Sequence, residues 1–148
     1  MALTDAPTST VLHATTVAVA GSALVIQGIS GAGKSALALE MMARGALLVS
    51  DDRTLVAVKG GMLIASAPDP IAGLIEARGL GLLHAVPAGP TPVKAVLDLS
   101  QTETQRLPQP KHISVLGQVI PLLHNAETSH FPAALVQYLK GGSQVVGS

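Results

Sequence analysis

The chain has 148 residues, of which 48% are hydrophobic and 12% charged, and a formal net charge of zero, a composition that predicts one folded domain and excludes a disordered chain. The absence of cysteine excludes disulfides, thiolate catalysis and cysteine-type zinc sites, and it fits a cytoplasmic protein. One phenylalanine, one tyrosine and no basic stripe argue against a nucleic-acid partner, and the longest apolar stretch, residues 17–26, is too short to span a membrane.

The first half of the chain reads mainly as strands, because runs of β-branched residues are separated by glycines. The predicted elements are a flexible leader over residues 1–10, strands over 11–21 and 22–28 that meet at Gly21 and Ser22, a helix over 35–45 that ends at Gly45, a buried strand over 46–52 and a hairpin over 54–67 that turns at Gly60 and Gly61. A single domain over residues 11–148 follows the leader.

The second half mixes strands, helices and irregular stretches. The predicted elements are a helix from Asp69 to about Arg78 closed by Gly79, an irregular segment over 81–92, a strand over 93–100, a polar loop over 101–111, a strand over 113–123 and a final helix over 130–142 with Pro132 in its first turn. The sequence thus predicts an α/β fold with a mixed β-sheet and three helices.

Residues 28–35 read GISGAGKS and match the phosphate-loop pattern G-x-x-x-x-G-K-[ST] in full. Backbone N–H groups of such a loop hold phosphates, its lysine reaches the outer phosphates and its serine ligates Mg²⁺. A chance match in a glycine-rich chain is the alternative, but the loop follows a predicted strand and opens a predicted helix. The predicted nucleotide-binding residues are Gly28, Ile29, Ser30, Gly31, Ala32, Gly33, Lys34 and Ser35, with Ser35 as a metal ligand.

Carboxylates and a histidine follow the pattern that phosphoryl transfer would need. Asp51 and Asp52 end a predicted strand, where one would serve Mg²⁺ and the other take a proton, although a solvated turn is the alternative. Glu76, near a predicted helix end, would need a cation such as Mg²⁺ or Arg78, although an exposed Glu-Arg pair fits equally. His13 would orient a carboxylate, or be a bystander in its strand.

Together, His13 in a hairpin, GISGAGKS, LVSDD and EARGLGLL resemble the catalytic domain of bacterial HPr kinase/phosphorylase, most strongly from His13 to about Leu83. The resemblance implies a carboxykinase-like P-loop nucleotide-binding fold. It also implies transfer of a phosphoryl group from ATP, or pyrophosphate in some members, to a serine of the phosphocarrier HPr, with Mg²⁺. The reverse attack by phosphate on phosphoserine would give pyrophosphate.

The resemblance assigns residue roles. Asp51 would be the base for phosphorylation, oriented by His13, while Asp52 would assist near the metal and the acceptor serine. Lys34 would contact the phosphates, Ser35 and Glu76 would serve Mg²⁺, and Arg78 belongs to the family's signature stretch. Arg106, in TQRLP, matches a later catalytic arginine that would steady charge on the transferred group.

The chain departs from the family pattern in two places. Residues 121–128, PLLHNAET, lack the arginines of the family's Pro-Gly loop. Whether the chain carries out the phosphorylase reaction is therefore left open. The short start before the first strand resembles a proteobacterial form without an N-terminal domain, and the family implies a homo-oligomer, a hexamer in known relatives. The alternatives are a small-molecule or carboxykinase-like P-loop enzyme, and a catalytically inactive nucleotide-sensing module.

Overall fold

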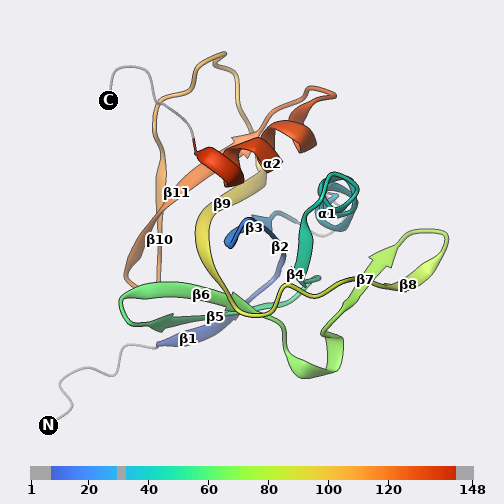
Figure 1. Cartoon of the computed structure of the whole chain (residues 1–148). Helices are drawn as coiled ribbons and strands as arrows, with labels where there is room; N and C mark the ends of the chain where they lie inside the picture. Colours follow the sequence, from blue (N-terminus) through green and yellow to red (C-terminus); the bar gives the residue numbers. More distant parts are fainter. Residues whose placement is uncertain (1–7, 30–32, 143–148) are drawn as a thin grey trace, which may run out of the picture.

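The computed structural model describes residues 8–29 and 33–142, in which a curled mixed β-sheet carries two α-helices on one side (Figure 1). The main sheet has the order β1-β5-β6-β9-β3-β2-β4, and the β10–β11 hairpin joins it through β11 and β9. The strands are β1 (Ser9–Leu12), β2 (Ala14–Val19), β3 (Ser22–Gln27), β4 (Leu47–Ser50), β5 (Thr54–Lys59), β6 (Met62–Ser66), β7 (Leu74–Ala77), β8 (Gly81–His84), β9 (Thr91–Thr102), β10 (His112–Val115) and β11 (Gln118–Asn125).

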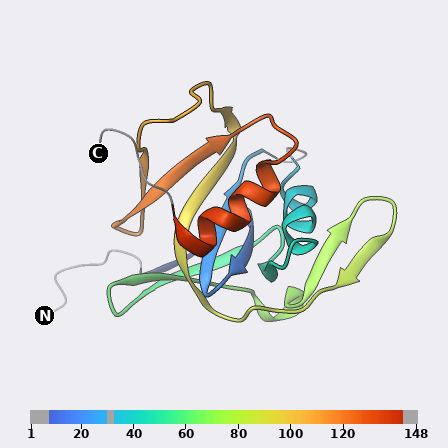
Figure 2. The same cartoon turned by 45° about the horizontal axis from the view of Figure 1, so that its top comes forward.

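Both α-helices, α1 (Lys34–Met42) and α2 (Phe131–Gly141), lie on the same face of the sheet, as the turned view also shows (Figure 2). They pack on a cluster of side chains from β2, β3 and β9, and Met41 and Leu139 are buried within it. Burying a side chain of this size contributes about 1.5–3 kcal/mol to the free energy of folding. The packing of Met41 therefore fixes α1, the helix that follows the phosphate-loop sequence, against the sheet.

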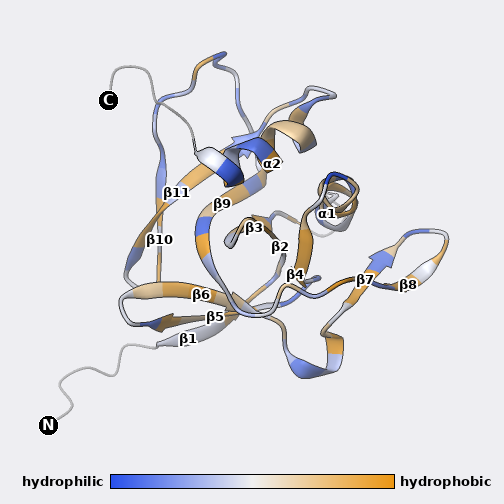
Figure 3. Cartoon of the chain, viewed as in Figure 1, coloured by the Kyte–Doolittle hydropathy of each residue, from blue (hydrophilic) through white to orange (hydrophobic). Residues whose placement is uncertain are grey.

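The opposite face of the sheet has a second core, made where the curled strands β5, β6 and β11 close over β2, β3 and β9. Val25, Val56 and Val96 are buried there. Figure 3 shows hydrophobic residues along these strands, while the long connection between β9 and β10 is mainly hydrophilic. No helix within the described residues is long and apolar enough to cross a membrane.

Several predicted elements of the sequence are confirmed, among them the buried strand predicted over 46–52, which forms as β4. The predicted hairpin forms as β2 and β3, although its two-residue turn is Ala20-Gly21, one position earlier than predicted, because Val19 pairs with Ser22. The strand predicted over 11–21 is broken at His13, because residues 11 and 12 belong to β1 and pair with β5. The β5–β6 hairpin turns at Gly60 and Gly61 as predicted. The helices predicted over 35–45 and 130–142 form as α1 and α2. Gly45 follows α1 with a φ of +104°, a backbone conformation that glycine adopts without strain.

The helix predicted from Asp69 to Arg78 is wrong. A three-residue 3₁₀ turn over Asp69–Ile71 is followed by the β7–β8 hairpin, which projects from the body of the molecule (Figure 1). The burial of residues 74–77 alternates with a period of two, with Ile75 buried and Glu76 exposed, which is a strand pattern. The Asp-Pro start signal was therefore overridden by the alternation and by the glycines that follow.

Four other boundaries differ from prediction. The segment predicted to be irregular over 81–92 contains strand β8 and the first two residues of β9. The strand predicted over 113–123 is a hairpin, because Leu116 and Gly117 both take positive φ and turn the chain between β10 and β11. Strand β9 continues to Thr102, so the polar loop is shorter than predicted. The predicted leader lies largely outside the described residues, but Ser9 and Thr10 pair with β5 as part of β1.

Candidate active site

The sheet topology brings the ends of several strands to one edge. Strands β2 and β3 are antiparallel, so Ala14, the first residue of β2, pairs with Gln27, the last residue of β3. Strand β4 is antiparallel to β2 and ends beside it, where Ser50 pairs with Thr16. Strand β9 is parallel to β3 and brings Asp98 beside Gln27. The connections that follow β3, β4 and β9 therefore all leave the same edge of the sheet.

The phosphate-loop sequence lies at this edge, between β3 and α1. Gly33 is the N-cap of α1 with a φ of +96°, a value that a residue with a side chain adopts only with strain. The Lys34 Nζ donates hydrogen bonds to the carbonyl oxygens of Gly28 at 3.0 Å and Ile29 at 3.4 Å, so it bends back over the start of the loop. Three of the predicted loop residues, Ser30, Gly31 and Ala32, lie outside the described residues.

Asp51 connects the loop helix to two neighbouring strands. Its Oδ1 accepts hydrogen bonds from Ser35 Oγ at 2.6 Å and from Thr15 Oγ1 at 2.9 Å. Its Oδ2 accepts the backbone N–H of Glu76 at 2.9 Å. The Asp51 residue is only 7% exposed, so these three donors replace the water that a carboxylate would otherwise bind. The serine of the phosphate loop and the aspartate after β4 are therefore in direct contact.

Thr15 is a site residue that the sequence reasoning missed. It is fully buried on β2, where its hydroxyl donates to Asp51 and accepts the backbone N–H of Asp52 at 3.1 Å. The available signal was the pair of threonines, Thr15 and Thr16, near the start of the otherwise apolar strand β2 and close to His13. A buried hydroxyl needs hydrogen-bond partners, and a carboxylate is the strongest partner available to it.

Asp52 differs from Asp51 in its environment, because it is exposed and its φ is +69°. The turn that holds it is closed by the Arg53 backbone N–H, which donates to the Asp51 carbonyl at 2.7 Å, and by Ser50 Oγ, which donates to the Arg53 carbonyl. An aspartate tolerates this left-handed conformation better than most residues, at a cost that the surrounding turn must offset. The result is a carboxylate held at the sheet edge and open to solvent.

Glu76 and Arg78 lie on the β7–β8 hairpin rather than on a helix. Both side chains are exposed, and the Glu76 backbone reaches the site through its bond to Asp51. In the extended strand this N–H can donate to Asp51, whereas in the interior of a helix it would donate to a carbonyl of the preceding turn. The hairpin therefore brings the Glu76 backbone into contact with Asp51, and Arg78 follows two residues further along the chain.

His13 and Arg106 lie on chain segments that border the same sheet edge. His13 is an exposed bend residue between β1 and β2, directly before the paired residue Ala14. Arg106 is exposed in the connection that leaves the end of β9. In the described part of the chain, no hydrogen bond joins either residue to Asp51 or Asp52.

The donor set at Asp51 fits a magnesium ion. Mg²⁺ prefers oxygen ligands and commonly retains waters, with one or two protein groups beside substrate phosphates. Ser35 Oγ and the Asp51 carboxylate supply such oxygens 2.6 Å apart. Within residues 8–29 and 33–142, no three histidine, aspartate or glutamate side chains are arranged to hold a metal by themselves. This is consistent with an ion held jointly by the protein and a phosphate.

The chain is thus a mixed α/β protein with a curled mixed sheet, in which a phosphate-loop sequence lies between a strand and a helix and its serine is bonded to an aspartate after a second strand of the same sheet. The family of the HPr Serine kinase C-terminal domain matches residues 5–89, more than half of the chain. The chain belongs to this family.

Curated relatives carry the same family name. The chain is 46% identical over 72 residues to the HPr kinase/phosphorylase of Mycoplasmopsis pulmonis, which covers 49% of this chain and 23% of that protein. It is 42% identical over 80 residues to the HPr kinase/phosphorylase of Brevibacillus brevis, which covers 53% of this chain and 25% of that protein. The chain thus spans about a quarter of the length of these relatives.

A solved structure confirms the fold. The Hpr(Ser) kinase/phosphatase from Coxiella burnetii superposes with a TM-score of 0.76, at 23% sequence identity, over 88% of each chain. The predicted α/β class with a mixed sheet is therefore confirmed, and the similarity extends beyond the region in which the sequences align well.

Proposed function

We propose that the chain is an ATP-dependent protein-serine kinase domain that phosphorylates the phosphocarrier HPr. The observation that carries this proposal is the contact between the phosphate-loop Ser35 and Asp51, with Asp52 exposed beside it. That arrangement provides a place for Mg²⁺ and phosphates and a separate carboxylate for an acceptor hydroxyl. The names of the relatives, HPr kinase/phosphorylase, supply the acceptor.

The donor nucleotide would be held by the loop and its lysine. Lys34 Nζ now satisfies carbonyl oxygens of Gly28 and Ile29, and it would exchange these for phosphate oxygens. Ser35 and Asp51 would hold Mg²⁺, directly or through water, with Glu76 as the second carboxylate. When bound, Mg²⁺ would neutralise charge on the outer phosphates of the nucleotide. The chain's own groups thus fix the donor phosphate at the end of β3.

Asp52 is the better candidate than Asp51 for the base that takes the serine proton. Both oxygens of Asp51 already accept hydrogen bonds. If Asp51 turned toward an acceptor serine, it would lose its bonds from Ser35 and Glu76, which hold the site together. Asp52 is exposed and is held by its backbone alone, through the bond from its N–H to Thr15. Its carboxylate would accept the hydroxyl proton as the serine oxygen bonds to the γ-phosphorus and the bond to the ADP oxygen breaks.

The remaining predicted residues would act around this centre. His13, directly before β2, would orient the Asp52 carboxylate. Arg106 would approach from the connection after β9 to stabilise charge on the transferred group. Arg78, on the projecting hairpin, would contact the acceptor protein or the phosphates. An open edge flanked by an exposed hairpin suits a protein acceptor better than a small molecule, which an enclosing pocket would have to hold.

Three further points belong to this proposal. Cleavage of phosphoserine by inorganic phosphate would use the same groups in reverse, with Asp52 returning the proton to the serine oxygen. A homo-oligomer and a cytoplasmic setting are also predicted from the family resemblance. Pyrophosphate remains an alternative donor, because the loop residues recognise phosphates and not the base.

The test is transfer of labelled γ-phosphate from Mg-ATP to purified HPr, beside HPr with its acceptor serine changed to alanine. We expect label on the unmodified carrier alone, and none when Asp52→Asn replaces the wild-type chain. ATP binding without any transfer would contradict the proposed kinase and favour a nucleotide-sensing module. Adding phosphate to labelled HPr and measuring pyrophosphate tests the reverse reaction.

A further inference from the structure

The connection between β9 and β10, residues 103–111, is tied to β11 at both of its ends. The Glu103 backbone N–H donates to the Asn125 carbonyl at 2.7 Å, and the Leu122 backbone N–H donates to the Lys111 carbonyl at 2.8 Å. Between these two anchors the connection leaves the sheet. Its stem is therefore fixed by backbone hydrogen bonds, and the conformation of its outer part must come from other contacts.

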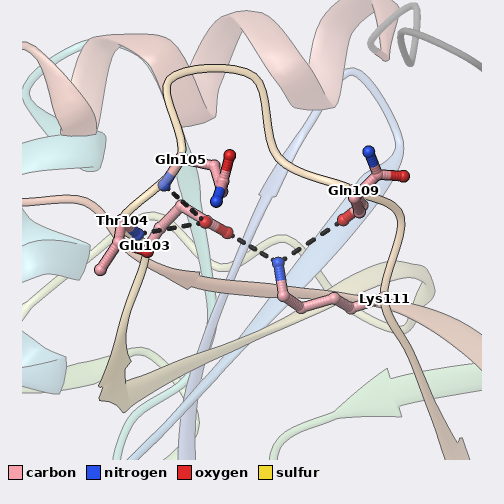
Figure 4. A network of polar contacts seen from close by, with 5 residues as sticks. All are labelled: Glu103, Thr104, Gln105, Gln109 and Lys111. Carbon is pink, nitrogen blue, oxygen red and sulfur yellow. Dashed lines mark hydrogen bonds and ion pairs between the residues drawn. The ribbon is translucent and has the colours of Figure 1, made fainter.

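The Glu103 side chain supplies those contacts, as Figure 4 shows. Its Oε2 accepts the backbone N–H groups of Thr104 at 3.1 Å and Gln105 at 3.0 Å. Its Oε1 accepts a hydrogen bond from Lys111 Nζ at 2.8 Å, and the same ammonium donates to the Gln109 carbonyl at 3.5 Å. One carboxylate thus joins the first residues of the connection to its last.

This ion pair is better shielded than the other salt bridge of the described residues. The side chains of Glu103 and Lys111 are 13% and 30% exposed, whereas those of Glu40 and Arg44 on α1 are 59% and 38% exposed. The hydrogen bond from Lys111, helped by the N–H of Gln105, lowers the pKa of Glu103, so its charged form is favoured in the folded chain. The Glu40–Arg44 pair offers a matched control of the same chemistry.

Apolar packing contributes little to this connection. Its one large hydrophobic residue, Leu107, is 53% exposed, and the prolines at 108 and 110 restrict the backbone without supplying N–H donors. The Glu103 carboxylate fixes the peptide N–H of Gln105, and Arg106 is the next residue. The peptide unit that Glu103 holds, between Thr104 and Gln105, therefore lies one residue before Arg106 and restricts the path of the backbone that leads to it.

We propose that Glu103 is a positioning residue, which holds residues 103–111 in the form that presents Arg106 to the transferred phosphoryl group. This inference rests on the function proposed above. It also rests on topology, because β9 runs parallel to β3 and its connection leaves the edge from which the phosphate loop leaves. Lys111 supports Glu103, and the two backbone N–H groups are the contacts that matter for the arginine.

The first experiment compares Glu103→Gln with the control Glu40→Gln in steady-state transfer to HPr. We expect Glu103→Gln to lower kcat about tenfold and to leave the KM for ATP within about twofold, because a misplaced group costs transition-state stabilisation and not nucleotide binding. Glu40→Gln should change neither value. An unchanged kcat in Glu103→Gln, or an equal loss in the control, would overturn the proposal.

A double-mutant cycle separates positioning from general stability. If Glu103 acts through Arg106, then Glu103→Gln should change kcat by less than about twofold in an Arg106→Ala background. Lys111→Met keeps both backbone contacts and should lose less activity than Glu103→Gln. A tenfold effect of Glu103→Gln that persists without Arg106 would show that the loss is structural and would refute the positioning role.

Trypsin supplies a readout that needs no transfer activity, because Arg106 is itself a cleavage site. In the native state, cleavage after Arg106 should be several-fold faster in Glu103→Gln than in the wild type and in Glu40→Gln. Equal rates would contradict any ordering by Glu103. A wild-type chain that transfers no phosphoryl group would overturn the proposed function and with it the role of Arg106, while the protease result would still decide whether Glu103 orders the connection.

Discussion

Exchanging Asp51 and Asp52 for asparagine should separate structure from chemistry. In Asp51→Asn, the amide can place only one acceptor oxygen. Its NH₂ group then faces either Glu76 N–H or the hydroxyls of Ser35 and Thr15, all of which now donate to the carboxylate. In one orientation the Glu76 N–H loses its acceptor, and in the other both hydroxyls lose theirs, in a site whose aspartate is only 7% exposed.

The size of the effect follows from these contacts. A hydrogen bond to a charged group contributes about 1.5–3 kcal/mol, and an unsatisfied buried donor costs about 1–3 kcal/mol. Because the hydroxyls can rotate to other acceptors, we expect Asp51→Asn to lower the free energy of unfolding by about 2–4 kcal/mol. For a chain of 148 residues this corresponds to a Tm lower by roughly 6–12 °C. Magnesium-dependent nucleotide binding should weaken as well.

Asp52→Asn is the matched control, because Asp52 is exposed and its side chain has no partner among the described hydrogen bonds. Its free energy of unfolding should stay within about 0.5 kcal/mol of the wild type, while transfer to HPr is lost. Urea unfolding and nucleotide titration of both variants, beside the transfer assay, give the comparison. An Asp51→Asn chain as stable as the wild type, or a fully active Asp52→Asn chain, would refute the reasoning.

Three smaller predictions follow from single contacts. Thr15→Val keeps the shape but removes the hydroxyl between Asp51 and the Asp52 N–H, and should cost about 1–3 kcal/mol in urea unfolding. Gly33→Ala, at a φ of +96° with open space around it, should lower Tm through backbone strain of about 1–2 kcal/mol. The pKa of Glu103 is lowered by folding, so its contribution is present above the unfolded pKa and lost as pH falls through the folded one; the difference in unfolding free energy between wild type and Glu103→Gln should vanish at acid pH.

The local parts of the fold were predictable because their signals lie close together in the sequence. The β2–β3 and β5–β6 hairpins were found from β-branched runs that meet at glycine, and α1 from its apolar spacing and Gly45. Each of these elements is completed by contacts within about twenty residues. The sheet order was not predictable in the same way, because the pairing of β9 with β3 joins residues about seventy positions apart.

The failed helix at residues 69–78 shows the limit of local signals. Asp69 and Pro70 do begin a turn, but only a 3₁₀ turn forms, and Asp69 is its first residue and not its cap, since the N-cap is Pro68 and no side chain caps the turn. Besides the alternation of burial and the pairing with β8, the extended form of β7 is supported by the bond from Glu76 N–H to Asp51, a partner 25 positions away. If residues 74–77 were helical, the Glu76 N–H would donate within the helix, and Asp51 Oδ2 would lose this hydrogen bond.

The sequence indicated the position of the candidate site, but it did not distinguish the roles of its two aspartates. The motif and the aspartate pair lie at one sheet edge, as their positions after predicted strands indicated, whereas the proposed choice between Asp51 and Asp52 rests on burial and hydrogen-bond partners. Thr15 decides much of that difference, since its hydroxyl binds the side chain of one aspartate and the backbone of the other. Nothing in the spacing of the two neighbouring carboxylates could separate them.

The short distance between the phosphate loop and Asp51 has a topological cause. Strand β4 is antiparallel to β2, and β2 is antiparallel to β3, so β3 and β4 run in the same direction with β2 between them. Helix α1 returns the chain between these two strands in nine residues, a length of about 13 Å. The helix must therefore begin at the edge where β3 ends, and β4 must end at that edge again. Ser35, in the first turn of α1, meets Asp51 because the chain passes this edge twice within sixteen residues.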